Sequence, residues 1–412
     1  MTQRTGPLLL PLLAIAIGLL TLSQSDVTAQ EGVGARETRK SEQSDREVVR
    51  DPSGTVRVKY ERGDKLRLGN RTTGPIVVIG WDRDDIEASA VGDRGAEAVR
   101  VNVYPDPSGA RIWLKADYAA SEERRVRPEL EFKTQPSVLR EALELFGLLD
   151  PETAHPAPLT LGPSVIQGPD SQPPFYSRPG EIFLEVKVPR YAEIELIEVN
   201  RSDVLVSGVE TAIAVSGAKS TVKLRRVGAA EVKTSSGDVE VDDAVGLVDV
   251  ITTGGAIVVK NARSDVRALS LSGRIEIQCA RGRVDVSNTD GPIILNGGGG
   301  DVSATATNSH VRFSGPIRAE GRYYLKSMSG AVEMEAPANS PGFTATLSSY
   351  RGGVETDFSL KITKSAADKG ASSVNRRLIG RHGNGQAQIT LDSFDGTVKL
   401  RKMAAGVLKD CR

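Results

Sequence analysis

Residues 232–277 read VKTSSGDVEVDDAVGLVDVITTGGAIVVKNARSDVRALSLSGRIEI, and this stretch decides the fold because one pattern recurs in it. Each copy runs apolar-x-apolar-x-Ser/Thr-x-x-Gly-x-apolar-x-apolar. Gly237, Gly255 and Gly273 occupy the same place in successive copies, 18 residues apart. A period near 20 residues is typical of a solenoid, in which each repeat covers the next.

The repeat extends well beyond this stretch. Successive anchor residues lie 18, 17, 18, 18, 18, 18, 21, 22 and 44 residues apart. The anchors are Ser202, Ser220, Gly237, Gly255, Gly273, Gly291, Ser309, Gly330, Gly352 and Gly396. Apolar residues alternate before and after each anchor, which is the period of a β-strand. The sequence therefore predicts two short strands in every repeat.

Stacking these units predicts an all-β fold, a parallel β-solenoid (β-helix) of about 18-residue, two-strand rungs. Ladders of Val, Ile and Leu would lie between two facing sheets, and parallel crossovers favour a right-handed coil. The alternative is a meander of antiparallel hairpins. That alternative needs Asn-Gly or Asp-Gly turns, which only Asp290-Gly291 and Asp395-Gly396 supply among the anchors.

The N-terminus has the features of a signal peptide, expected over residues 1–29. Arg4 precedes an apolar run from Leu8 to Leu20, and Val27-Thr28-Ala29 offers small residues for cleavage. The run is short for a membrane span, so cleavage is favoured over a retained anchor. We therefore expect an exported protein (periplasmic, cell-surface or secreted), with a disordered leader at residues 30–53 and no stable transmembrane segment after cleavage.

The rest of the chain divides into four segments. Residues 54–118 contain five strand-like runs and are expected to form N-terminal β rungs. Residues 119–180 form an insertion with one amphipathic helix at Ser137–Leu149, followed by a proline-rich stretch. The helix could cover the sheet as a lid or bind a partner or membrane surface. Residues 181–402 form the repeat domain, and 403–412 are a tail.

Charge and composition exclude several classes of protein. The 53 basic and 53 acidic residues give a net charge of 0, so nucleic acid is not an expected partner. Only three histidines and two cysteines are present, which argues against a His/Cys metal site, and no cofactor is expected. Cys279 falls within a strand repeat and Cys411 is next to last, so two unpaired thiols are favoured over a disulfide.

A column of hydroxyl and amide residues precedes the anchors by three positions. Its members are Thr234, Thr252, Ser270, Asn288, Ser327, Ser349 and Ser393. Their parity matches the buried positions, which favours hydrogen bonding to turn backbone at a corner. The alternative is an exposed polar stripe that binds sugar or ice.

Three segments of the chain resemble the bacterial putative-adhesin family, a domain of unknown function built from β-strand repeats. They are Gly74–Asp84 (GPIVVIGWDRD), Phe183–Pro189 (FLEVKVP) and Thr234–Val241 (TSSGDVEV). The resemblance covers residues 54–118 and 181–400, and residues 119–180 depart from it. It implies a β-helical exported protein and offers no catalytic residues.

A search for chemistry gives few candidates. The aspartates around Trp81 and the pair Asp242-Asp243 form no acidic ladder of the kind a polysaccharide-cleaving enzyme or calcium site needs. Asn296–Asp301 (NGGGGD) lacks the Gly-Lys-Ser/Thr of a phosphate loop, so it indicates a wide turn. The best ligand-contact candidates are Trp81, Tyr323 and Tyr324, whose rings could stack on sugar or fill gaps in the core.

The sequence therefore predicts a non-enzymatic, exported β-solenoid that acts as an adhesin-like envelope or surface interaction module. Its partner would be an unidentified protein or glycan. Two alternatives stay open, a carbohydrate-active enzyme on a β-helix scaffold and a self-assembling structural solenoid.

Overall fold

The structure, a computed structural model, describes residues 47–70, 72, 74–92, 99–105, 111–118, 183–366, 376–403 and 411. The chain divides into two units, Met1–Glu42 and Gln43–Arg412, and the described residues all belong to the second. The expected signal peptide, the expected helix at 137–149 and the proline-rich stretch lie outside the described residues. The described part contains strands in two sheets and no helix long and apolar enough to span a membrane.

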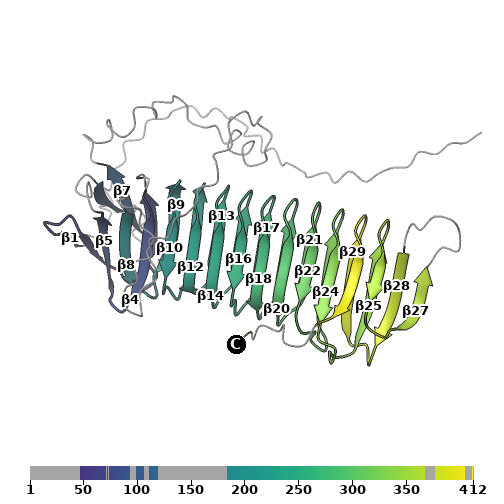
Figure 1. The fold of residues 1–412 in the computed structure, drawn as a ribbon. Helices are drawn as coiled ribbons and strands as arrows, with labels where there is room; N and C mark the ends of the chain where they lie inside the picture. Colours follow the sequence, from purple (N-terminus) through teal and green to yellow (C-terminus); the bar gives the residue numbers. More distant parts are fainter. Residues whose placement is uncertain are drawn as a thin grey trace, which may run out of the picture. The chain divides into compact units, whose positions relative to one another are not determined.

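Sheet A contains 15 of the described strands (Figure 1). In spatial order they are β1 (Val48–Arg50), β2 (Val56–Lys59), β5 (Asp85–Val91), β8 (Phe183–Pro189), β4 (Ile76–Trp81), β10 (Val204–Ser207), β12 (Val222–Val227), β14 (Val239–Ala244), β16 (Ile257–Lys260), β18 (Ile275–Ala280), β20 (Ile293–Gly298), β22 (Val311–Ser314), β24 (Val332–Ala336), β30 (Val398–Lys402) and β26 (Val354–Thr356).

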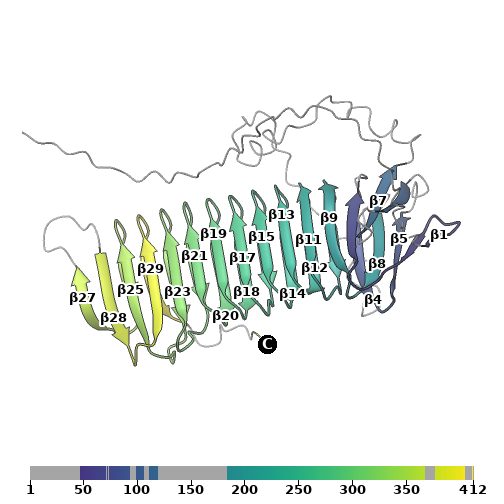
Figure 2. The same ribbon diagram turned by 180° about the vertical axis from the view of Figure 1, so that it is seen from behind.

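Sheet B contains another 15 described strands, several of which are labelled in Figure 2. In spatial order they are β27 (Lys361–Ala366), β28 (Arg376–His382), β25 (Phe343–Ser349), β29 (Ala387–Ser393), β23 (Arg322–Ser327), β21 (Val302–Ala306), β19 (Val284–Asn288), β17 (Val266–Ser270), β15 (Val248–Thr252), β13 (Ala230–Thr234), β11 (Ile213–Ala218), β9 (Glu193–Asn200), β3 (Lys65–Asn70), β7 (Arg111–Tyr118) and β6 (Val99–Pro105).

Successive repeats pair in parallel, as a β-solenoid requires. Val239 lies opposite Ile257, and Ile257 lies opposite Ile275, so each repeat is in register with the next. The inward residues of the two sheets form one continuous core, in which Val250 and Val259 are fully buried. Each such aliphatic side chain stabilises the fold by about 1.5–3 kcal/mol on burial. The predicted fold class is confirmed, and the hairpin meander is excluded for the repeats.

The polar column of Thr234, Thr252 and their equivalents is buried at one corner, and it bonds to turn backbone. Thr252 Oγ1 donates to the carbonyl of Gly254 at 2.7 Å, and Ser270 Oγ donates to that of Ser272 at 2.6 Å. Ser393 Oγ donates to the carbonyl of Gly330 and accepts from the N–H of Gly396. At most 8% of any member is exposed, so the column holds the corner together and is closed to a ligand.

The last repeats do not stack in the order of the sequence. In sheet B, β29 lies between β23 and β25, and in sheet A, β30 lies between β24 and β26. The 44-residue interval between Gly352 and Gly396 contains the excursion through β27 and β28, after which the chain returns to fill the inner position. The hairpin of β27 and β28 closes this end of sheet B with antiparallel pairing.

At the other end, residues 54–118 both continue the solenoid and flank it. β3 and β4 pair in parallel with β9 and β10, extending both sheets. β2, β5 and β6 add antiparallel strands beyond them. The strand β1 starts at Val48, inside the segment expected to be a disordered leader, because its residues pair antiparallel with β2. The ordered region therefore starts before residue 54.

Candidate functional site

The outward faces of the two sheets differ in their exposed apolar side chains. Of the 14 large apolar residues exposed in the described part, five lie on strands of sheet B and four follow such a strand directly. The strand residues are Tyr104, Ile251, Leu269, Tyr324 and Ile362, and the following residues are Leu271, Met328, Tyr350 and Phe394. Three lie on sheet A strands, all of them near the antiparallel end. The outer face of sheet B is therefore the more apolar.

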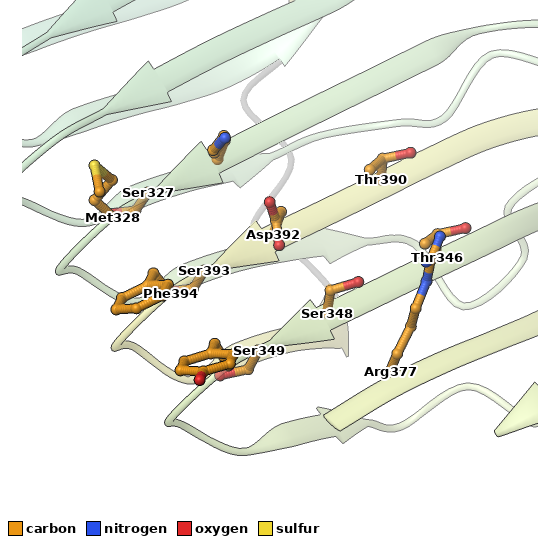
Figure 3. Close-up of a pocket in the computed structure, with 12 residues that line it drawn as sticks. Ser327, Met328, Thr346, Ser348, Ser349, Arg377, Thr390, Asp392, Ser393 and Phe394 are labelled. Atoms are coloured by element: carbon orange, nitrogen blue, oxygen red, sulfur yellow. The ribbon is translucent and has the colours of Figure 1, made fainter. Parts of the chain in front are cut away.

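A hollow of about 480 Å³ lies on this face, over β23, β29, β25 and β28. The strand residues Thr346, Ser348, Thr390 and Asp392 have their side chains on the outer face of the sheet (Figure 3), whereas Ser327, Ser349 and Ser393 belong to the buried polar column at its edge. We call this surface the sheet B hollow. Its lining residues are Lys326, Ser327, Met328, Thr346, Ser348, Ser349, Tyr350, Arg377, Thr390, Asp392, Ser393 and Phe394.

The floor of the hollow is one row of side chains that crosses four strands. Lys326 lies opposite Asp392, Asp392 lies opposite Ser348, and Ser348 lies opposite Arg377. Neighbouring strands are about 4.8 Å apart, so the backbones of the two end members are separated by roughly 14 Å. Among the described residues, none of the three charged groups has an ion-pair partner within 4.0 Å. The row thus presents positive, negative, hydroxyl and positive groups in that order.

One rim of the hollow is apolar. Phe394 and Tyr350 follow β29 and β25, and their rings stack with centroids 4.7 Å apart and planes 11° from parallel. Met328 follows β23 on the neighbouring rung, and half of its surface is exposed. The guanidinium of Arg351 lies 5.3 Å from the centroid of the Phe394 ring and pairs with Asp395 at 3.1 Å, and these contacts help to hold the rim in place. The rings of Phe394 and Tyr350 and the thioether of Met328 together form an exposed apolar ledge beside the charged row.

Several charged side chains on the outer face of sheet A form ion pairs. Lys260 contacts Glu240 at 2.8 Å, and this hydrogen bond lowers the pKa of the Glu240 carboxyl. Arg312 contacts Glu335 at 2.9 Å in the same sheet. The unpaired charges of the hollow therefore contrast with the ion pairs of sheet A.

The three residues predicted to contact a ligand lie in different environments. Trp81 ends β4 in sheet A, and its indole N–H donates to the carbonyl of Asp85 at 2.8 Å. The cationic groups of Arg83 and Lys187 lie 4.9 and 5.9 Å from its ring centroid. Trp81 is therefore held by its neighbours and lies on the sheet opposite the hollow.

Tyr323 takes the second of the two roles left open by the sequence, because it fills a gap in the core and is not available to stack on sugar. Only 1% of it is exposed, its ring packs against Phe313, and its hydroxyl accepts a hydrogen bond from the N–H of Arg318 at 2.9 Å. This burial raises the pKa of Tyr323. Tyr324 points the other way, is 41% exposed and lies on β23 two residues before Lys326. The structure thus places one of the three beside the hollow.

The aspartates suspected of chemistry are in structural contacts. Arg190 pairs with Asp82 at 2.6 Å, and this contact lowers the pKa of the carboxyl. Asp84 accepts a hydrogen bond from the Tyr191 hydroxyl, and Asp243 pairs with Arg263 at 2.9 Å. In the described segments, no group of three or more His, Cys, Asp or Glu residues could hold a metal ion.

The two cysteines form a disulfide, so the expectation of free thiols was wrong. Cys279 and Cys411 have Cα atoms 5.0 Å apart and close a loop of 132 residues. Cys279 has a φ of +57°, and this backbone conformation turns its side chain out of the core, contrary to its parity in the strand. Gly297 lies above it on the next rung, where a Cβ would meet Cys411 Sγ at 2.5 Å.

Sequence reasoning missed the sheet B hollow. Asp392, Ser348 and Arg377 are far apart in the sequence, and they become neighbours only because β29 inserts beside β25 and β28 turns back along it. Lys326 and Asp392 share the place three residues after an inward residue, Tyr323 and Ile389 respectively. That shared place was the available signal, but it does not reveal which rungs adjoin.

Comparisons with known proteins agree with the fold. No curated protein matches the chain. A solved structure from Clostridium sporogenes, described as a "putative cell adhesion protein", is 6% identical to the chain, covering 85% of this chain and 99% of that one. Its TM-score is 0.17, and at that value the likeness carries no argument. The family model described as Toastrack DUF4097 matches residues 180–401, more than half of the chain, so the protein belongs to the Toastrack family.

Proposed function

We propose that the protein is an exported, non-enzymatic binding module of the cell envelope or surface, with the outer face of sheet B as its binding face. The observation that carries the proposal is the sheet B hollow, where unpaired charged groups and an exposed apolar ledge lie side by side. Contiguous exposed apolar surface with a polar border is typical of interaction sites.

The disulfide supports export. Disulfides persist in oxidising compartments such as the periplasm or the cell exterior and are rare in the cytosol. The bond between Cys279 and Cys411 is therefore expected of a chain that leaves the cytoplasm. This argument is independent of the apolar run at Leu8–Leu20, which lies outside the described residues.

The arrangement of carboxylates supports binding over catalysis. Glycoside hydrolysis uses two carboxyl groups that flank the scissile bond. The sheet B hollow has one carboxylate, Asp392, among its lining residues. Asp82 and Asp243, outside the hollow, are tied to arginine side chains.

The test is cosedimentation of purified protein, residues 30–412, with envelope material from the source cells. We expect the wild-type protein to sediment, and we expect a Tyr350→Ser, Phe394→Ser variant to remain in solution. A sheet A variant, Arg312→Gln with Lys399→Gln, is the matched control and should sediment like the wild type. Equal sedimentation of all three proteins, or none, would contradict the proposal.

The same preparation separates the two alternatives. Turnover of a polysaccharide panel that is lost with Asp392→Asn would replace the binding module by an enzyme. Light scattering that shows growth of assemblies with concentration would indicate a self-assembling solenoid.

A further inference from the structure

We infer that the sheet B hollow binds an anionic polysaccharide in which neutral sugars separate the acidic ones. This inference rests on the proposed function and names the ligand of the same face. It is carried by the order of charges in the row Lys326, Asp392, Ser348 and Arg377, together with the apolar ledge beside that row.

The two cations select for acidic groups. Among the described residues, Lys326 and Arg377 have no ion-pair partner, so both can donate hydrogen bonds to a carboxylate of the ligand. Guanidinium and ammonium groups form strong charge-assisted hydrogen bonds with carboxylates. The lining carries two positive groups against one negative group, which gives it complementarity to an anion.

The position of Asp392 restricts where the acidic groups can be. Asp392 lies between the two cations in the row, directly opposite Lys326 and Ser348. A carboxylate on every sugar would bring one acidic group against Asp392, and like charges in contact are unfavourable. A neutral sugar placed there can instead donate its hydroxyl hydrogens to Asp392. The row therefore fits a polymer that crosses the strands with acidic groups at intervals.

The remaining lining groups suit sugars better than a peptide. The side chains of Thr346, Ser348 and Thr390 add hydroxyls that both donate and accept hydrogen bonds. The ladder hydrogen bonds of β25 are already made with β28 and β29, so the floor offers no free strand edge for a peptide to join. The stacked rings of Phe394 and Tyr350 provide a ledge for the apolar face of a sugar ring.

The experiment measures binding of four immobilised polymers to the protein, residues 30–412, at low and physiological salt. They are hyaluronan, in which uronate alternates with a neutral sugar; polygalacturonate, in which every sugar is acidic; dextran, which is neutral; and poly-glutamate, an acidic peptide. We expect hyaluronan to bind most tightly. Lys326→Gln and Arg377→Gln should each weaken it about tenfold, the loss expected for one charge-assisted hydrogen bond.

Asp392→Asn tests the argument about the spacing of the acidic sugars, because it removes the repulsion between Asp392 and a carboxylate of the polymer. We expect this variant to gain affinity for polygalacturonate, so that the preference between the two acidic polymers shrinks. The sheet A variant Lys399→Gln should leave all four affinities unchanged. Circular dichroism of each variant verifies that the fold is intact.

Three results would overturn the inference. Poly-glutamate binding as tight as hyaluronan would show a site for acidic peptides, and equal binding of both acidic polysaccharides would refute the role of Asp392. If the Lys326 and Arg377 variants bind hyaluronan as tightly as the wild type, the polymer binds elsewhere on the protein. In each case, envelope cosedimentation that still depends on Tyr350 and Phe394 would leave the proposed function intact, whereas its absence would remove both.

Discussion

The stacking of glycines at one turn of the solenoid gives the sharpest test of the fold. Gly255 has a φ of +105°, and a Cβ built on it would lie 2.3 Å from the carbonyl oxygen of Gly237 on the preceding rung. Ordinary van der Waals contact starts at 3.4 Å, so the methyl group would be about 1.1 Å too close to backbone. Because that backbone is held in both sheets, the atoms cannot move apart without loss of ladder hydrogen bonds.

Gly255→Ala should therefore destabilise the protein by two effects. A positive φ costs a non-glycine residue about 1–3 kcal/mol, and overpacking against fixed backbone adds about 1–3 kcal/mol. Gly63 isolates the first effect, because its φ is +97° and nothing lies within 4 Å of its added Cβ. We expect Gly255→Ala to cost about 2 kcal/mol more than Gly63→Ala.

The assay is equilibrium urea unfolding followed by circular dichroism, with wild type, Gly63→Ala and Gly255→Ala measured side by side. Gly54→Ala is a second control, since its φ is +84° and its added Cβ is also free of neighbours. If all three variants lose the same stability, rungs do not approach each other at Gly255 as closely as described. The solenoid stacking itself would then be wrong.

Three further predictions concern the disulfide, the polar corner and one surface ion pair. Replacing Cys279 and Cys411 by serine should cost about 2–5 kcal/mol, because the bond closes a 132-residue loop, and added reductant should destabilise only the wild type in urea. Ser393→Ala should cost about 1–3 kcal/mol in the same assay, because it leaves two partly buried backbone groups without this partner, whereas an exposed Thr→Ala control should be near neutral. The hydrogen bond with Lys260 lowers the pKa of Glu240 in the folded protein. Glu240 therefore stabilises the fold at pH values above its pKa in the unfolded chain, and this contribution is lost as the pH falls through its pKa in the folded protein. Glu240→Gln should therefore be less stable than wild type by under about 1 kcal/mol near neutral pH and equally stable in strong acid, and a constant difference across pH would contradict this.

The rungs could be predicted from the sequence because every rung repeats the same alternation of apolar and polar residues around its anchor. Val239, Ile257 and Ile275 stand two places after an anchor, and all three are buried. The same rule also assigns Tyr323: it stands seven places before Gly330, which is an inward position in the other repeats. Applied consistently, parity would have separated Tyr323 from Tyr324 without coordinates.

The order of the outer rungs could not be predicted in this way. The alternation of apolar and polar residues specifies which face of the sheet a residue joins, but it does not specify which rungs are neighbours. Nothing in the local sequence therefore indicates that β29 pairs with β23. The disulfide could not be predicted from the sequence for a different reason. A positive φ at Cys279, which recurs at Asp243 and Asn261 of the preceding rungs, reverses its side chain relative to strand parity, and simple alternation does not reveal this bend.

The insertion of β29 and β30 ahead of β25 and β26 affects how the protein can form as it leaves the ribosome. Solenoids can grow by adding neighbours in turn, and nascent chains emerge N-terminus first. Here the strand that belongs beside β23 is translated after β25, which has matching alternation and could occupy that place prematurely. The solenoid can therefore be completed only after almost the whole polypeptide has been translated. A chain that ends before residue 387 lacks β29, and we expect its β25 to pair with β23 in the place that β29 normally occupies.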